Sequence, residues 1–245
     1  MTWIRVAATL VSTGLLGMAA ASPTWGQSVS PPLVEYQERA RSSFQLHNPS
    51  IFPIVVVLEV RGFSISEQGE VIDTPLDTSR IHVKLSEMSF RIPPRVTRTV
   101  FYEATGDSLP AWFNILSAMS GTRTESGLNV RVLLPHVVYL NQKQPLRRAD
   151  LAIRRIELDS GGKKVRVLLE NLSPKLGRVY QLSVSDDGHT SQPGGGFPLM
   201  PRSRRWAEVD WPNATPPSRV ALRLSRFTLD TLFSPSAVPL AADTP

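Results

Sequence analysis

The 245-residue chain contains no cysteine. Without cysteine, a disulfide framework, a thiol nucleophile and any cysteine-ligated metal site are excluded. Histidine is scarce as well, because only four are present and no two of them stand at metal-ligand spacing. The sequence therefore predicts no metal site and no cofactor, and it predicts that hydrophobic cores stabilise the folded chain.

Motifs for catalysis by other residue types are also missing. No Gly-x-Ser-x-Gly elbow occurs, and nothing in the sequence places a serine, a histidine and an acid together. The glycines Gly194–Gly196 have no helix behind them, as a phosphate-binding loop would need. The stretch 186–188 has too few alternating carboxylates for a calcium loop and is typical of a hairpin turn. We therefore predict no catalytic residues and a protein that is not an enzyme.

Basic residues are in slight excess, with 27 Lys and Arg against 21 Asp and Glu. They are scattered, and the longest clusters are only Arg147-Arg148, Lys163-Lys164 and residues 202–205. No aromatic residues alternate with these clusters, as they do in proteins that bind single-stranded nucleic acid. Nucleic acid is therefore not a predicted partner.

Residues 1–26 have the pattern of a secretory signal peptide. One charge, Arg5, precedes an apolar run from Val6 to Ala21, and small residues follow it. The run is short for a membrane span, and cleavage is expected after Ala21 or after Gly26. No later segment is apolar enough to cross a bilayer. We predict export, with no stable membrane insertion after the signal is removed.

From residue 27 onward, short alternating apolar runs are punctuated by proline, glycine and asparagine, which is typical of β structure. Ile54–Val60 is almost continuously apolar and is predicted to be buried on both faces. Gly121–Gly127 is predicted to be a polar loop. The strands predicted in this half are Val29–Tyr36, Ser43–His47, Ile54–Val60, Val71–Ile72, Phe90–Ile92, Thr97–Tyr102, Leu109–Leu116 and Leu128–Leu140.

The pattern restarts after a polar, basic linker at Asn141–Arg148. Asn48-Pro-Ser and Asn171-Leu-Ser each end a second strand, which indicates the same topology twice. The strands predicted in this half are Leu151–Leu158, Lys164–Leu169, Val179–Val184, Phe197–Met200, Arg205–Val209, Val220–Leu224 and Phe227–Leu232. The sequence thus predicts an all-β fold of two immunoglobulin-like β-sandwich domains in tandem, at residues 27–143 and 147–233, followed by a disordered tail at 234–245.

The stretch Leu128–Leu140 contains the most informative strand. Four apolar residues at alternate positions share one face of it: Leu128, Val130, Val132 and Leu134. Pro135 removes a backbone donor in the middle of the run, which an edge strand tolerates and a central strand does not. Because an apolar edge invites pairing with other chains, either the fold covers this edge or offering it is the function.

The order of several short motifs resembles a known family. In the first half, VSPPLVEY comes first, a strand ends in HNPS, FRIPP precedes TRTVFY, and LPAWFNIL leads to a strand that closes in VVYL. In the second half, ENLS and FPLMPRS follow. This order is similar to that of the PapD-like proteins, the periplasmic chaperones of pilus assembly, over residues 29–233.

The resemblance implies an L-shaped pair of sandwiches and a non-enzymatic function in the periplasm. Pilus subunits in this family resemble immunoglobulin domains that lack their last strand, and the chaperone donates a strand in its place. The resemblance assigns subunit binding to Leu128, Val130, Val132 and Leu134. It implies pilus or fimbrial subunits and an outer-membrane usher as partners.

The sequence departs from the family at the site that binds the subunit's terminal carboxylate. Well-known members use an arginine on the first strand and a lysine near the end of the seventh strand. Here Val137 stands at the lysine position, and Val29–Tyr36 contains no arginine. Arg39, Arg41 or His136 could replace this pair. An alternative function is therefore a PapD-like structural or adaptor protein of the envelope that binds a partner other than a pilus subunit, and an exported hydrolase is a third.

Overall fold

The computed structural model describes residues 26–233, apart from 124–128, 160, 187 and 214. Its elements are nineteen strands and one short 3-10 helix, Arg148–Asp150. No helix among these residues is long and apolar enough to cross a membrane. The predicted tail, and all of the predicted signal peptide except its last residue, lie outside the described residues.

Strands β1 to β10 form an N-terminal unit with two sheets. One sheet has the order β1-β3-β8-β6, and the other has the order β2-β10-β9-β4, with β5 and β7 also paired to β4. The strands are β1 (Ser28–Ser30), β2 (Leu33–Gln37), β3 (Arg39–His47), β4 (Ile54–Ile65), β5 (Val71–Thr74), β6 (Ile81–Leu85), β7 (Ser89–Ile92), β8 (Thr97–Gly106), β9 (Ala111–Arg123) and β10 (Asn129–Asn141).

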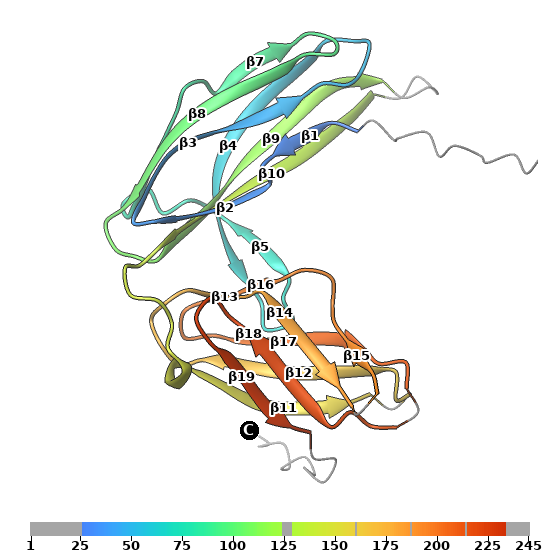
Figure 1. Cartoon of the computed structure of the whole chain (residues 1–245). Helices are drawn as coiled ribbons and strands as arrows, with labels where there is room; N and C mark the ends of the chain where they lie inside the picture. Colours follow the sequence, from blue (N-terminus) through green and yellow to red (C-terminus); the bar gives the residue numbers. More distant parts are fainter. Residues whose placement is uncertain (1–25, 124–128, 160, 187, 214, 234–245) are drawn as a thin grey trace, which may run out of the picture.

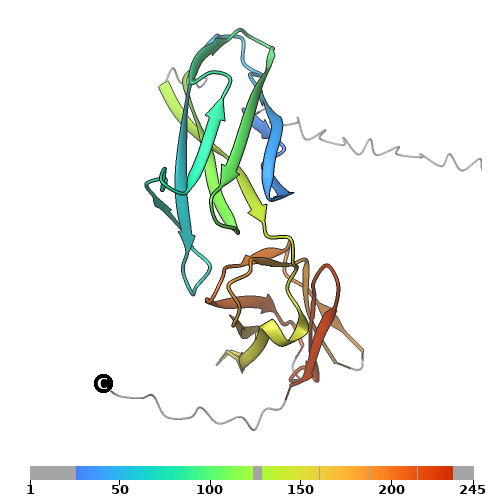
Figure 2. The same ribbon diagram turned by 90° about the vertical axis from the view of Figure 1, so that its left-hand side faces the viewer.

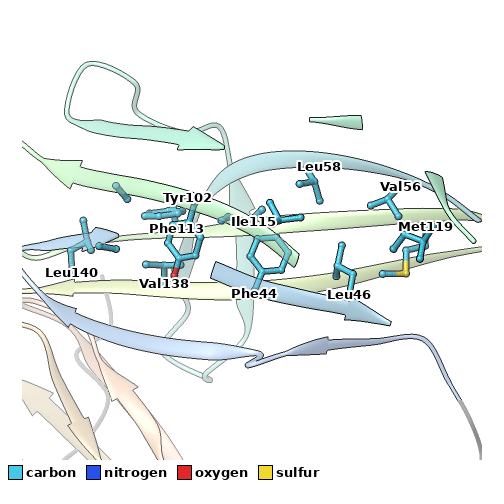
Figure 3. Packing of buried hydrophobic residues seen from close by; sticks show 14 of the residues in the cluster. Phe44, Leu46, Val56, Leu58, Tyr102, Phe113, Ile115, Met119, Val138 and Leu140 are labelled. Carbon is cyan, nitrogen blue, oxygen red and sulfur yellow. The ribbon is translucent and has the colours of Figure 1, made fainter. Parts of the chain in front are cut away.

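The two sheets of the N-terminal unit face each other across one hydrophobic core. Phe44 and Leu46 of β3 point toward Phe113, Ile115 and Val138 of the opposite sheet (Figure 3). These side chains are at most 1% exposed, because alternate residues of a strand point to the same face. The strand predicted at Ser43–His47 is thus present within β3, and it buries Phe44 and Leu46.

The prediction that Ile54–Val60 is buried on both faces is wrong. Ile54, Val56 and Leu58 are buried, whereas Val55 is 39% and Val57 is 48% exposed. Among the described residues, no second layer covers the outer face of this sheet. The run is apolar on both sides although only one side packs against a core, so its continuous hydrophobicity predicts the strand but not its surroundings.

The predicted first strand is in fact two strands that belong to different sheets. β1 pairs antiparallel with β3, and β2 pairs in parallel with β10. Pro31 and Pro32 separate the two strands. The sequence analysis also missed β6, and it placed a loop from Gly121 where β9 continues to Arg123.

Strands β11 to β19 form a C-terminal unit with its own core. A three-stranded sheet, β11-β12-β17, packs against a four-stranded sheet, β15-β14-β18-β19, and β13 pairs with β16. The strands are β11 (Leu151–Leu158), β12 (Lys164–Asn171), β13 (Gly177–Val179), β14 (Gln181–Ser185), β15 (Thr190–Ser191), β16 (Phe197–Leu199), β17 (Arg204–Asp210), β18 (Arg219–Arg223) and β19 (Thr228–Leu232). Leu151–Leu158 matches its prediction, Val179–Val184 is divided at Tyr180, and β15 was missed.

Both units contain the same asparagine corner. Asn48 is fully buried, its amide nitrogen donates to the carbonyls of Ile92 and Pro93, and its amide oxygen accepts from the Ser50 hydroxyl. The equivalent side chain in the C-terminal unit makes the same set of contacts, which join Asn171 to the carbonyls of Leu199 and Met200 and to the hydroxyl of Ser173. The predicted repeat is therefore present as matching hydrogen bonds, because each corner ties the end of one strand to the end of a later one.

The two units touch through side chains from both. Phe63 and Tyr139 pack with Leu176 and Met200 in a small third cluster. The hairpin of β4 and β5 reaches the C-terminal unit, where the Trp206 amide donates to the carbonyl of a hairpin residue, Glu67, over 2.7 Å (Figures 1 and 2). The predicted domain boundaries and the predicted L shape stay predictions.

Replacing Asn171 with alanine tests the corner. Asn171 is 1% exposed, so Asn171→Ala leaves buried carbonyls without donors and is expected to lower the free energy of unfolding by about 2–3 kcal/mol. Urea unfolding of the full chain measures this change. Asn213→Ala is a matched control, because the side-chain bond that Asn213 makes within the described residues joins it to Asp186 in a less buried position. Equal effects of the two substitutions would contradict the role of the corner.

Candidate functional site

Strand β10 is hydrogen-bonded on both sides over only part of its length. It pairs with β9 along nearly its whole length, but β2 covers only Val137–Asn141. The first bond on this side runs from the Val137 amide to the carbonyl of Pro32, which directly precedes β2, over 2.8 Å. From Asn129 to His136, no described strand pairs with this side of β10. We call this part of β10 the free edge.

The N-terminal strands would be expected to cover the free edge, but they do not pair with it. β1 runs close to β10, and its hydrogen-bonded neighbour is β3 in the other sheet (Figure 1). The chain therefore changes sheets between β1 and β2. This change leaves the upper half of β10, Asn129–His136, unpaired on one side in the described structure.

Pro135 lies where its missing N–H costs no bond to β9. The Val137 amide and the Asn141 carbonyl both face β2, so the peptide groups of odd-numbered residues point to that side of the strand. The register does not shift between Val132 and Leu140, so Leu133 and Pro135 point to the free edge. The prediction that Pro135 marks an edge holds for the upper half of β10, whereas the lower half is central.

The structure describes only some of the four predicted subunit-binding residues. Leu128 lies outside the described residues. Val130 pairs with Thr122 through its backbone, and its side chain lies outside the described part. Val132 and Leu134 are half-buried and pack against the N-terminal core, and the register shifts between Val130 and Val132. Their role in binding stays a prediction.

The opposite face of the same sheet carries exposed apolar residues that the sequence analysis missed. Leu133 of β10 stands opposite Ala118 of β9, which stands opposite Val57 of β4. Leu133 is 57% and Val57 is 48% exposed. The alternating pattern of Leu128–Leu134 indicated the opposite face of β10. The order of the strands in the sheet is needed to show that Leu133, Ala118 and Val57 form one row.

His136 is fully buried, and both of its ring nitrogens have partners. Nδ1 lies 2.7 Å from the Pro31 carbonyl and Nε2 lies 3.0 Å from the Tyr102 hydroxyl. The ring stacks on Phe44 at a centroid distance of 4.7 Å. Because a carbonyl can only accept, Nδ1 carries the proton and donates it to Pro31. Burial lowers the pKa of His136, and the bond to Pro31 opposes this shift, so the ring is neutral near pH 7.

The three predicted anchor residues do not form one site. Arg39 and Arg41 lie on the outer face of β3, in the other sheet, and Arg41 pairs with Glu103 over 3.1 Å. His136 instead lies between the two sheets. A carboxylate at the free edge would therefore not meet these three residues together, and their role as anchors stays a prediction.

A cavity of about 270 Å³ lies where the two units meet. Glu35 and Tyr139 line it from the N-terminal unit, and Arg178 and Arg226 line it from the C-terminal unit, with Lys143 between them in the sequence. Arg178 forms an ion pair with Glu35 and lies 5.3 Å from the centre of the Tyr139 ring. The cations outnumber the carboxylate, so this cavity suits an anion. Sequence analysis missed it because its residues come from distant segments.

No group of three or more residues in the described part is arranged to hold a metal ion. Asp186 makes local hydrogen bonds to Gly188 and His189, as a turn residue does. These bonds lower the pKa of Asp186, Gly188 having the largest effect.

The two tandem β-sandwiches define the class of fold, and comparisons with known proteins agree with it. No protein-family model and no curated protein matches the chain. A crystal structure of the YadV chaperone is 14% identical, with a TM-score of 0.50 over 84% of this chain and 99% of that chain. A structure of the Salmonella enterica SafA pilin in complex with the SafB chaperone is 13% identical, with a TM-score of 0.51 over 87% of this chain and 99% of the matched chain. The resemblance to PapD-like chaperones is thus confirmed at the level of the fold.

The pKa of His136 gives a testable dependence of stability on pH. The unfolded chain binds a proton at His136 near pH 6.5, whereas the folded chain binds it only at a lower pH. The contribution of neutral His136 to the free energy of unfolding is therefore fully present above about pH 6.5. It is lost as the pH falls through the folded pKa. Urea unfolding at several pH values should show this decrease, and His136→Gln should remove part of it. His82→Gln, which replaces an exposed histidine, is the control; an unchanged slope in His136→Gln would contradict the assignment.

Proposed function

We propose that the protein is a PapD-like periplasmic chaperone that binds pilus or fimbrial subunits by strand addition at the free edge of β10. The observation that carries this proposal is the half-paired β10, which offers unused peptide groups beside apolar side chains. Such an edge pairs readily with another extended segment. The protein acts without a catalytic step or a cofactor, and an outer-membrane usher is its second partner.

Strand addition supplies binding energy from the backbone and from side chains. Each ladder hydrogen bond contributes about 0.5–1.5 kcal/mol net. Each apolar side chain that leaves water adds about 1.5–3 kcal/mol. We propose that Leu128, Val130, Val132 and Leu134 fill the subunit's groove, where its missing strand would lie.

The fold shared with fimbrial chaperones supports this function. The SafB chaperone, which shares the fold, was solved in complex with a pilin. Export by the predicted signal peptide would bring the chain to the compartment where such subunits are assembled. The apolar row of Leu133 and Val57 provides a further exposed surface for a second partner such as the usher.

The terminal carboxylate of a subunit needs a cation, and the cations nearest to β10 lie beyond the free edge, where the subunit chain would extend past its last bond to β10. Arg178 and Lys143 line the cavity there, close to Tyr139, the third-last residue of the strand. They are better placed than Arg39 and Arg41, which face away from the core on another sheet. Because Arg178 already pairs with Glu35, an incoming carboxylate would compete with that glutamate.

The second candidate function is an envelope adaptor that binds a partner other than a pilus subunit. The scattered positions of Arg39, Arg41 and His136 favour it, because they leave the expected carboxylate anchor incomplete. The partner recovered with the full chain distinguishes the two functions. A subunit that lacks its last strand supports the chaperone, and any other protein supports the adaptor.

Substitutions on β10 test strand addition. The tagged full chain is purified from the periplasm of its source, and bound proteins are identified by mass spectrometry. Val132→Asp should reduce the recovered subunit by about tenfold or more, because a carboxylate would have to be desolvated in the groove. Leu133→Pro should have a similar effect, because it removes an N–H that points to the free edge while it spares the bonds to β9.

Phe101→Asp is the matched control, because Phe101 is an apolar residue that is 61% exposed on β8, in the other sheet. It should leave capture unchanged. Urea unfolding of each variant separates lost binding from lost stability. Full capture by folded Val132→Asp and Leu133→Pro chains would overturn the proposal.

A further inference from the structure

The point where the free edge ends is determined by specific side chains. Above Val137, β2 no longer pairs with β10, although β1 continues close to it. We propose that Pro32, Pro135 and His136 form a stop that keeps the N-terminal strand off the upper half of β10 and so sets the length of the edge that a partner can use. This inference deepens the proposed function and rests on it.

The two prolines remove both hydrogen bonds of the next step in the ladder. In the parallel register, the Val137 amide donates to Pro32, and the carbonyl of Val137 faces Val34. One step further up, residue 32 would donate to the carbonyl of residue 135, and residue 135 would donate to the carbonyl of Ser30, which is paired with Gln45 of β3. Both donors would be prolines, which have no N–H. The ladder between β2 and β10 therefore cannot continue past Val137.

His136 holds the segment between β1 and β2 at the same level. Its Nδ1–H donates to the Pro31 carbonyl over 2.7 Å, so that carbonyl points into the core and not along the edge. The Tyr102 hydroxyl, 3.0 Å from Nε2, and the Phe44 ring, 4.7 Å from the imidazole, fix the orientation of the donor. The Tyr36 hydroxyl lies 3.3 Å from that of Tyr102, so β2 itself is tied to the same network.

The stop also defines what a partner strand can bond to. Leu133 offers both an N–H and a carbonyl on the free edge, whereas Pro135 offers only a carbonyl. The next donor, the Val137 amide, is already bonded to Pro32. A partner strand therefore finds donors only at positions above Pro135, and its own ladder must end there.

Amide hydrogen exchange on the free full chain tests the stop without a partner. The amides of Val137 and Tyr139 face β2, and those of Val138 and Leu140 face β9. In His136→Leu, the first pair should exchange about tenfold faster while the second pair keeps its protection. His136→Asn retains a side-chain N–H donor and should restore most of the protection, and His82→Leu should change neither pair. Equal loss at all four amides would show general destabilisation and overturn the role of His136.

The proline pair is tested by restoring its donors. In Pro32→Ala, the new amide at residue 32 should be protected, because it can donate to the Pro135 carbonyl, which pairs with no described strand. In the double variant Pro32→Ala, Pro135→Ala, the new amide at residue 135 should also be protected, and this second bond requires the Ser30 carbonyl to leave Gln45 of β3. Subunit capture by the double variant should fall, because a shorter free edge remains. Rapid exchange at both new amides, or unchanged capture, would overturn the stop. If the unmodified chain captures no subunit, the proposed function fails while the exchange results still decide whether the stop exists.

Discussion

The need of every backbone donor and acceptor for a partner is the constraint that organises this molecule. β10 meets it in two ways, because its lower half lies between two strands and its upper half is bonded to β9 alone among the described strands. The side chains follow the same division. Val138 and Leu140 are fully buried beside the doubly paired half, whereas Val132 and Leu134 are only half-buried beside the free edge. One half of β10 thus belongs to the stable core of the sheet, and the other half is open to a partner.

Local patterns in the sequence predicted much of the fold. Period-two alternation identified most strands, and the asparagine corners at Asn48 and Asn171 indicated the repeat. The sheet change between β1 and β2 could not be predicted, because it depends on Pro32 meeting a residue more than one hundred positions away. The exposure of Val57 was missed for a related reason, since hydrophobicity does not reveal whether a second layer covers a sheet.

The candidate site shows the same limit. His136 has the same parity as Val132, Val138 and Leu140, so alternation alone places it on the inner face of β10. The alternation therefore indicates a buried His136, although histidine is common at functional sites. The ion pair between Arg178 and Glu35 had no local signal, because it joins the two units.

The lower end of β10 lies in the contact between the units, where Tyr139 packs against Leu176 and Met200. β10 therefore runs without interruption from the free edge to the contact between the two sandwiches. The same strand thus supplies the free edge at one end and a side chain of the contact between the units at the other.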